Sequence, residues 1–434
     1  MALSILRCIE CGHTHQLDEP VYVCGVCGGL LDVIHDFDSL EAPITRELFD
    51  KRLGSLDAPY NSGVWRYKEM VFPGAADNEI VTRGEGNTTL YKTPKKLAAW
   101  IGAERLALKH EGENPTGSFK DRGMTGGVTH AVMVEASGVV CASTGNTSAS
   151  MASYAALADL QALVFFPYGN IAVGKLAQSV AYGAINVQVK GDFDTSLDLV
   201  RQACREFGIY LLNSVNPFRL EGQKTIVFEI IQQRRWQVPD WIVLPGGNLG
   251  NTSAFGKGLK EMFDLGLIDK LPRIAVIQAE GAAPFYHSYK EDFATRHTVK
   301  ANTIATAIKI GNPASYVKAR RALEWTNGIV EMVTDQEIVD AKAQVDLSGI
   351  GCEPASAASV AGVKKLIANG VIHPDDDVVA VLTGHVLKDP SVVMDYHQGT
   401  LDGFQTPYAN HLRTIEPTLA DVQTLLNQEK TQTR

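Results

Sequence analysis

Residues 113–123, ENPTGSFKDRG, contain a lysine whose position favours covalent chemistry. A proline and a glycine interrupt the chain there, and Ser118 is suited to cap a helix that begins near Phe119. Lys120 then lies in the first helical turn, where the positive end of the helix dipole destabilises an ammonium ion. A lysine with a lowered pKa can act as an amine nucleophile or form a Schiff base. The alternative is a surface lysine that pairs with Asp121.

Residues 142–148, ASTGNTS, follow a short apolar run. The alanine-rich stretch Ala149–Ala158 comes next and predicts a helix, whose first N–H groups lack intrahelical partners. Together with the hydroxyl groups and the Asn146 amide, such a helix start can bind a carboxylate. An ordinary capping turn is the alternative. One cap needs only one such residue, however, and this segment has five hydroxyl or amide side chains.

Residues 245–251, PGGNLGN, lie between the apolar run Trp241–Leu244 and a helix predicted to begin near Thr252. Glycines let the backbone close round a phosphate group, whose charge is stabilised by N–H groups and the helix dipole. The segment is not a Walker A sequence, because no Lys-Ser/Thr pair follows, and it lacks the spacing of the dinucleotide-binding fingerprint. A glycine-rich turn without a ligand is the alternative.

A fourth segment, residues 381–390 with the sequence VLTGHVLKDP, ends the late apolar run Val378–Leu382. Thr383 at the end of this run offers a neutral hydroxyl group that suits a ring nitrogen. In open α/β sheets, ligands bind where strands give way to helices. Thr-Gly is common at strand ends, so this segment is a weak signal when taken alone.

The N-terminal residues contain two Cys-x-x-Cys pairs that are separated by twelve residues. Two such pairs can place four thiolates in a tetrahedron around Zn²⁺. Four thiolates leave zinc no open position for water, so the predicted site is structural and not catalytic. Reduced cysteines in an exposed segment are the alternative. The four predicted ligands are Cys8, Cys11, Cys24 and Cys27.

Short apolar runs and amphipathic stretches alternate from about residue 86 onward, and these elements must hold the four polar segments in place. Such alternation predicts crossover units and buried parallel sheets with helices on both faces, which is an α/β fold. Amphipathic helices are predicted over Leu220–Trp236 and Asp335–Leu347. The predicted strands are Val139–Ala142, Ala162–Phe166, Ile185–Val189, Ile209–Leu212, Trp241–Leu244, Ile274–Gln278 and Val378–Leu382.

The chain divides into three parts by composition. Residues 1–35 form a zinc-ribbon-like segment, residues 36–85 a connector rich in aromatic and charged residues, and residues 86–434 the body. The connector is too apolar to be a flexible linker, so it is predicted to pack on the body or across an oligomer interface. The last two dozen residues are polar with helical spacing, and no role is predicted for them.

The overall charge limits the partners. The formal net charge is −9, which disfavours nucleic acid and acidic membrane surfaces because both attract positive proteins. No apolar run approaches the ~20 residues that span a bilayer, and residues 1–12 lack the apolar region of a signal peptide. A cytoplasmic protein is therefore expected.

Taken together, the four polar segments resemble the threonine synthase family of pyridoxal-phosphate (PLP) enzymes. GSFKDRGM at 117–124 is similar to the cofactor-lysine motif, and STGNT at 143–147 to the loop for the substrate carboxylate and the ring hydroxyl. Residues 247–251 resemble the cofactor-phosphate cup, and residues 382–385 the segment that faces the ring nitrogen. The resemblance runs in order from about residue 80 to 390. Further matches lie at residues 213–225, 308–315 and 352–358.

The resemblance implies a two-domain PLP fold of type II, with a smaller subdomain at roughly 125–220 inserted in the larger one. It implies a lyase of threonine biosynthesis, usually a homodimer, that converts O-phospho-L-homoserine and water to L-threonine and phosphate. Lys120 would bind PLP as a Schiff base and act as the base at Cα and Cβ. The other implied cofactor residues are Asn146 for the ring hydroxyl, Gly247, Asn248, Leu249, Gly250 and Asn251 for the phosphate, and Thr383 for the ring nitrogen.

The implied substrate carries a phosphate and a carboxylate, so the site needs cations besides Lys120. Arg219 is predicted to bind the substrate phosphate, because the guanidinium group can bind phosphate with two parallel hydrogen bonds. Lys224 and Lys175 are second choices. The alternative for each of the three residues is that it is a solvent-exposed cation without a ligand. The carboxylate is predicted to be bound by Ser143, Thr144 and Thr147.

Two other functions are weighed against this prediction. A threonine or serine dehydratase of the same fold would not need a basic pocket for a substrate phosphate. An inactive regulatory protein would use the ribbon to bind a partner or nucleic acid. The complete set of cofactor motifs and the acidic charge disfavour the second alternative.

Overall fold

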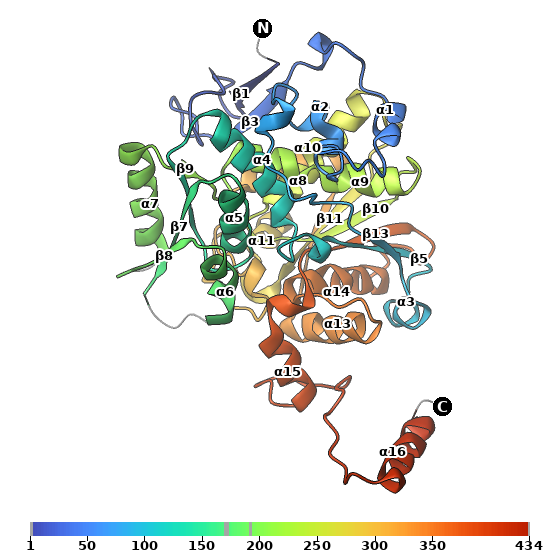
Figure 1. The fold of residues 1–434 in the computed structure, drawn as a ribbon. Coiled ribbons are helices and arrows are strands. Elements are labelled where there is room, and N and C mark those ends of the chain that lie inside the picture. Colours follow the sequence, from blue (N-terminus) through green and yellow to red (C-terminus); the bar gives the residue numbers. More distant parts are fainter. Residues whose placement is uncertain (1–2, 169–172, 191–192, 433–434) are drawn as a thin grey trace.

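The computed structural model describes residues 3–168, 173–190 and 193–432. Within these residues the strands form three sheets, of three, six and four strands. In Figure 1 the six-stranded sheet and its helices make up the largest part of the molecule, and the four-stranded sheet lies beside it. The α/β fold class predicted from the sequence is confirmed.

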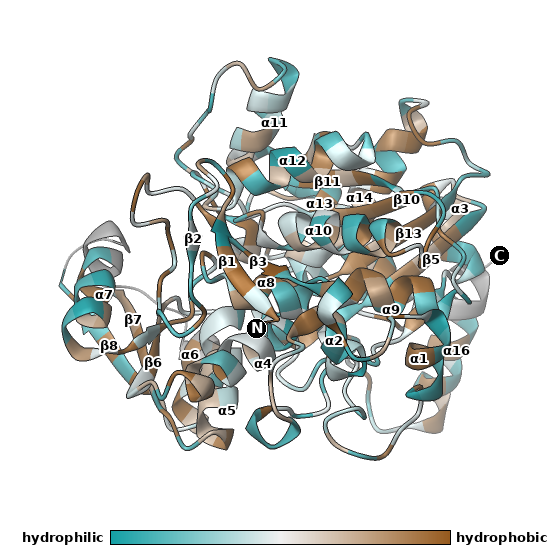
Figure 2. Ribbon diagram, turned by 90° about the horizontal axis from the view of Figure 1, so that it is seen from above, coloured by the Kyte–Doolittle hydropathy of each residue, from teal (hydrophilic) through white to brown (hydrophobic). Residues whose placement is uncertain are grey.

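The large sheet consists of β4 (Leu90–Lys92), β5 (Arg105–His110), β10 (Trp241–Pro245), β11 (Arg273–Ala279), β12 (Ile329–Val333) and β13 (Asp377–Leu382). Its strand order is β12-β11-β10-β13-β5-β4, and all neighbours are parallel except the edge pair β4 and β5. Side chains alternate between the two faces, so Val243 and Ala380 belong to one apolar core while Leu244 and Val381 belong to the other. In Figure 2 the strands of this sheet are mostly hydrophobic.

Helices cover both faces of the large sheet, as buried parallel strands require. One face is covered by α3 (Lys95–Ile101), α13 (Asp335–Leu347) and α14 (Pro354–Ala368). The other face is covered by α9 (Thr225–Gln233), α10 (Gly250–Asp264) and α12 (Tyr316–Thr326). The remaining helices of this part are α11 (Pro284–Lys290) and α15 (Pro390–Gln398).

The small sheet is fully parallel and has the order β8-β7-β6-β9. Its strands are β6 (Gly138–Ala142), β7 (Gln161–Pro167), β8 (Ile185–Val189) and β9 (Tyr210–Leu211). The helices around it are α4 (Lys120–Met133), α5 (Asn146–Leu157), α6 (Val173–Ala181) and α7 (Phe193–Phe207), and α8 (Pro217–Gln223) leads back to the large sheet. All seven predicted strands are confirmed.

One predicted helix differs from the structure. The stretch Leu220–Trp236 was expected as a single helix, but α8 ends at Gln223 and α9 begins at Thr225. The interruption adjoins a close contact between α8 and α4, where a Cβ atom at Gly222 would stand 1.7 Å from the carbonyl oxygen of Arg122. Only glycine permits this approach, and the local sequence does not reveal it.

The N-terminal part packs on the body. Strands β1 (Ser4–Cys8), β2 (Thr14–His15) and β3 (Leu31–His35) form an antiparallel sheet of order β2-β1-β3. The connector that follows contains α1 (Arg46–Lys51) and α2 (Lys68–Val71), and it buries aromatic side chains against the body. The Tyr67 ring packs on Phe228, and Trp65 donates a hydrogen bond to Thr125 at 2.6 Å.

The C-terminal helix α16 (Leu419–Gln432) lies away from the rest of the molecule (Figure 1). Its Leu419 side chain is exposed. Among the described residues, no helix is both long enough and apolar enough to cross a membrane.

Candidate active site

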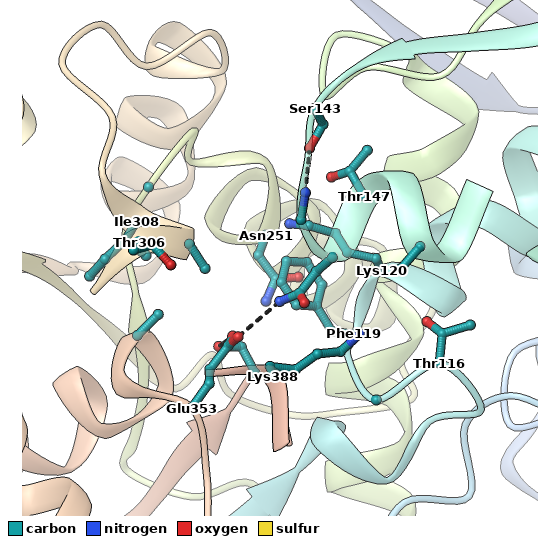
Figure 3. Close-up of a pocket in the computed structure, with 18 of the residues that line it drawn as sticks. Thr116, Phe119, Lys120, Ser143, Thr147, Asn251, Thr306, Ile308, Glu353 and Lys388 are labelled. Carbon is teal, nitrogen blue, oxygen red and sulfur yellow. Dashed lines mark hydrogen bonds between the residues drawn. The ribbon is translucent and has the colours of Figure 1, made fainter. Parts of the chain in front are cut away.

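A cavity of about 1050 Å³ lies at the carboxyl ends of strands from both parallel sheets. The last residues of β6 and β10, Ala142 and Pro245, line it, as does Thr383 directly after β13. The four polar segments singled out in the sequence therefore meet in one place, although 263 positions separate Lys120 from Thr383 in the numbering. Figure 3 shows how side chains from both sheets point into this space.

Lys120 is the first residue of α4, as predicted, but Ser118 does not cap this helix. The N-cap residue is Phe119, and the Ser118 hydroxyl has no hydrogen-bond partner in the described part of the chain. The segment is instead held by the loop after β13. The Phe119 N–H donates to the carbonyl oxygen of Thr383 at 3.0 Å, and the His385 N–H donates to that of Gly117 at 2.9 Å. Tertiary hydrogen bonds thus replace the expected local cap.

The surroundings of Lys120 favour its neutral amine. Burial, and after it the positive charge of Arg219, lowers the pKa of Lys120 to about 7, against the opposing effect of Glu353. The ammonium group lies over the Phe119 ring, 3.8 Å from its centroid. The alternative of a pair with Asp121 does not hold, because the Asp121 carboxylate accepts hydrogen bonds from Thr116 and Ser150.

Residues 247–251 close the opposite side of the cavity around the start of α10. Leu249 is the N-cap residue with φ +63°, and its side chain cannot satisfy the first N–H groups of the helix. A Cβ atom at Gly247 would lie 3.1 Å from the Cα of Ile308, so a glycine permits the close packing of this turn. The buried amide of Asn251 has no hydrogen-bond partner among the described residues for either its oxygen or its nitrogen. These unpaired donors at a helix N-terminus fit a phosphate group.

The loop after β6 brings hydroxyl and amide groups to the same space. Ser143, Thr144 and Thr147 line the cavity, and α5 begins at Asn146. The Asn146 amide nitrogen donates to the carboxylate of Glu353 at 2.9 Å, a bond drawn as a dashed line in Figure 3. This bond links the start of α5, beside the small sheet, to Glu353 at the start of α14, which covers the large sheet.

Of the three cations predicted for the substrate phosphate, the structure describes the side chains of Arg219 and Lys224, which differ in position. Arg219 on α8 lines the cavity, and burial lowers its pKa to about 10. One of its terminal nitrogens donates to the carbonyl oxygen of Leu212 at 3.0 Å, while its Nε has no partner among the described residues. The prediction that Lys224 binds the substrate phosphate is wrong, because Lys224 lies outside the cavity and its ammonium group pairs with Glu221 and Glu261. The side chain of Lys175 lies outside what the structure describes.

Glu353 and Lys388 are among the polar residues of the cavity that were not predicted as site residues. Glu353 lies inside a segment that matched the family only as a whole, and it is 5% exposed. Lys388 follows Thr383 in the same loop, and its ammonium group donates to Gln178 of the small sheet's α6. The available sequence signal was a glutamate directly before Pro354, inside a segment that matched the family. Nothing in the local sequence indicates that this side chain is buried or where it points.

The four N-terminal cysteine thiols also converge. Their sulfur atoms all lie within 4.8 Å of one another, with 3.5 Å between Cys8 and Cys27 and 3.6 Å between Cys11 and Cys24. A tetrahedral zinc ion with Zn–S bonds of about 2.3 Å separates its ligands by roughly 3.8 Å. The observed spacing is close to that value and fits a metal site.

Comparison with known proteins places the cavity in context. Residues 81–384 match the family model described as pyridoxal-phosphate dependent enzyme. The threonine synthase of Methanocaldococcus jannaschii is 48% identical over 390 residues, which cover 89% of this chain and 94% of the relative. The threonine synthase of Methanosarcina acetivorans is 49% identical, covering 90% and 93%. The crystal structure of Escherichia coli threonine synthase has the same fold, with a TM-score of 0.67, 17% identity, and coverage of 98% of this chain and 100% of that one.

Proposed function

Because the chain belongs to the threonine synthase family of pyridoxal-phosphate dependent enzymes, we propose how the residues of its cavity divide the reaction among themselves. The enzyme is a lyase that converts O-phospho-L-homoserine and water to L-threonine and phosphate. The observation that supports the division most directly is that Lys120 and the turn at 247–251 open into one cavity. One cofactor molecule can therefore contact both.

The polar groups of the cavity fit PLP. Lys120 would bond the cofactor aldehyde, and the turn at 247–251 with the unpaired Asn251 amide would bind its phosphate. Asn146 would face the ring hydroxyl and Thr383 the ring nitrogen. When bound, PLP supplies an electron sink that stabilises negative charge on substrate carbon atoms.

Lys120 is the proposed base. With a pKa of about 7, a large fraction of its amine is neutral near neutral pH and can accept a proton from the substrate Cα. The same group would then remove a proton from Cβ and supply one to Cγ, from which phosphate leaves, while water adds at Cβ. The Phe119 ring covers one side of this amine.

The substrate's two anionic groups have separate partners in this proposal. Ser143, Thr144 and Thr147 would bind the carboxylate with hydroxyl groups beside the start of α5. Arg219 would bind the phosphate, because its Nε proton points to no protein acceptor in the described residues. A buried guanidinium without a carboxylate partner suits an anionic ligand.

We expect the purified enzyme to release phosphate from O-phospho-L-homoserine with equal formation of threonine. Release of keto acids from threonine or serine should be at least about a hundredfold slower, because the Arg219 site is left without its anion. Inorganic phosphate should inhibit competitively. These assays separate the proposal from a dehydratase of the same fold. A dehydratase would release keto acids faster than phosphate and would not be inhibited by inorganic phosphate.

The four cysteines are proposed to bind a structural zinc ion, and we expect about one zinc per chain by elemental analysis. Replacement of one ligand, Cys24→Ser, should abolish zinc binding and lower the melting temperature, because metal binding contributes folding free energy. Cys204→Ser, outside the cluster, is the control and should keep the metal. Protein prepared without chelators that holds no zinc would contradict this assignment.

The proposal includes the organisation of the chain. The zinc-ribbon-like segment would comprise residues 1–35, the connector 36–85 and the catalytic body 86–434, with a smaller subdomain at roughly 125–220. The four-stranded sheet at residues 138–211 supports that subdomain. We further propose that the enzyme is a homodimer, which light scattering of the purified protein would test, and that it is cytoplasmic, which fractionation of the cells that make it would test.

A further inference from the structure

The side chain of Glu353 is directed away from the helix that it precedes. Glu353 is the N-cap residue of α14, yet its carboxylate accepts no hydrogen bond from the first turn of that helix. Acidic residues at this position commonly accept such bonds. Here the carboxylate turns into the cavity instead, where Figure 3 shows it near the end of the large sheet.

This carboxylate joins two residues that the proposed function assigns to the cofactor ring. Its Oε2 accepts from the Asn146 amide nitrogen at 2.9 Å, and its Oε1 lies 3.4 Å from the hydroxyl oxygen of Thr383. Asn146 is the first residue of α5, directly after the β6 loop, and Thr383 belongs to the loop after β13. One side chain therefore connects the polar ends of both sheets.

The backbone fixes the place of this carboxylate. The Glu353 N–H donates to the carbonyl oxygen of Gly384 at 3.0 Å. A Cβ atom at position 384 would stand 2.4 Å from the Glu353 Cδ, so the carboxylate packs directly on the glycine backbone. An alanine at 384 would displace it.

The Thr383 hydroxyl lies between two other polar side chains, Ser356 and Glu353. The Ser356 hydroxyl accepts from the Gly384 N–H at 2.8 Å, and it lies 3.1 Å from the Thr383 hydroxyl and 3.3 Å from the Gly384 carbonyl oxygen. Thr383 can donate to the Glu353 carboxylate over a long contact of 3.4 Å. These contacts hold the Thr383 hydroxyl at the wall of the cavity.

We propose that Glu353 is a positioning residue, resting on the proposed function, that orients the Asn146 amide toward the ring hydroxyl of PLP and holds the Thr383 hydroxyl beside the ring nitrogen. A carboxylate in this place would also stabilise positive charge on the bound cofactor. Glu353 itself touches the two side chains, and its effect on the ring passes through them.

Burial raises the pKa of Glu353 above its ordinary value, and Asp389, in the same loop as Lys388, adds to this effect. The Asn146 hydrogen bond and the charges of Lys388 and Lys120 oppose it in part. The carboxylate therefore faces basic groups on α4 and on the β13 loop.

The test is a pH titration of the visible absorption band of the bound cofactor in the full-length holoenzyme. In Glu353→Gln the apparent pKa of the spectral transition should fall by about one unit, because a charged acceptor is replaced by a neutral amide. The kcat should fall while the KM for O-phospho-L-homoserine changes little. Glu353→Asp keeps the charge and should keep most of the spectral pKa.

Two further variants sharpen this test. Thr383→Val should shift the transition in the same direction, and the double variant should shift it by less than the sum, since both changes break one chain of hydrogen bonds. Glu324→Gln removes an exposed carboxylate on α12 and should titrate as the unmodified enzyme does. Loss of bound cofactor without any shift in the remaining holoenzyme would overturn the proposal. The titration does not depend on turnover, so its outcome is distinct from a failure of the phosphate-release assay.

Discussion

Replacement of Lys120 by alanine is expected to abolish covalent attachment of the cofactor and to lower the rate of phosphate release by at least about a thousandfold. Lys120 is the amine at the start of α4 that opens into the cavity, so its removal takes away both the proposed bond to the aldehyde and the proposed base. Borohydride reduction followed by mass spectrometry should locate the trapped adduct at Lys120 in the unmodified enzyme and find none in the variant.

The control is Lys260→Ala, which removes a lysine on α10 whose ammonium group pairs with Asp264 on the surface. This variant should keep the adduct and the activity. The lowered pKa of Lys120 adds a pH dependence. Uptake of PLP by cofactor-free enzyme should slow about tenfold per unit as pH falls below 7, because only the neutral amine attacks the aldehyde. An adduct on another lysine, or uptake that is flat down to pH 5, would refute the assignment.

The sequence predicted the parts of the fold that have strong local signals. The strands of the small sheet and β10, β11 and β13 are apolar runs, and their ends carry the polar segments. Strand β5 was missed because its sequence, RLALKH, is interrupted by charge. Its Lys109 is buried all the same, since the ammonium group bonds to Glu229 and to the Thr88 carbonyl oxygen. Only the tertiary structure brings these acceptors to the strand.

The candidate site was also predicted where the local sequence signal is strong. Segments with several polar residues in a row, such as 143–147 and 247–251, indicate a binding loop from sequence alone. Lys224 was a second choice for the substrate phosphate, but five residues turn a helix by about 500°, which leaves the side chains of Arg219 and Lys224 about 140° apart. Helical geometry could have excluded Lys224. Glu353 could not have been found in this way, because its side chain takes partners from two distant strand ends.

Arg219→Ala is the second change expected to have a large effect, and it should raise the KM for O-phospho-L-homoserine about a hundredfold. The guanidinium group lines the cavity with an unpaired Nε, so its loss removes a charged hydrogen-bond donor from the substrate phosphate. The absorption of bound cofactor should persist, because the cofactor phosphate is assigned to 247–251. Inhibition by inorganic phosphate should weaken in parallel with the rise in KM.

The same variant tests the electrostatic coupling between Arg219 and Lys120. The positive charge of Arg219 lowers the pKa of Lys120, so its removal should raise that pKa and move the uptake of PLP by cofactor-free enzyme to higher pH. Arg219→Lys keeps the charge but loses the planar fork, and it should restore the pH dependence without restoring the full affinity for substrate. Unchanged kinetics in Arg219→Ala would remove this residue from the phosphate site. A raised KM with no change in the pH dependence would show that Arg219 binds the substrate without controlling the amine.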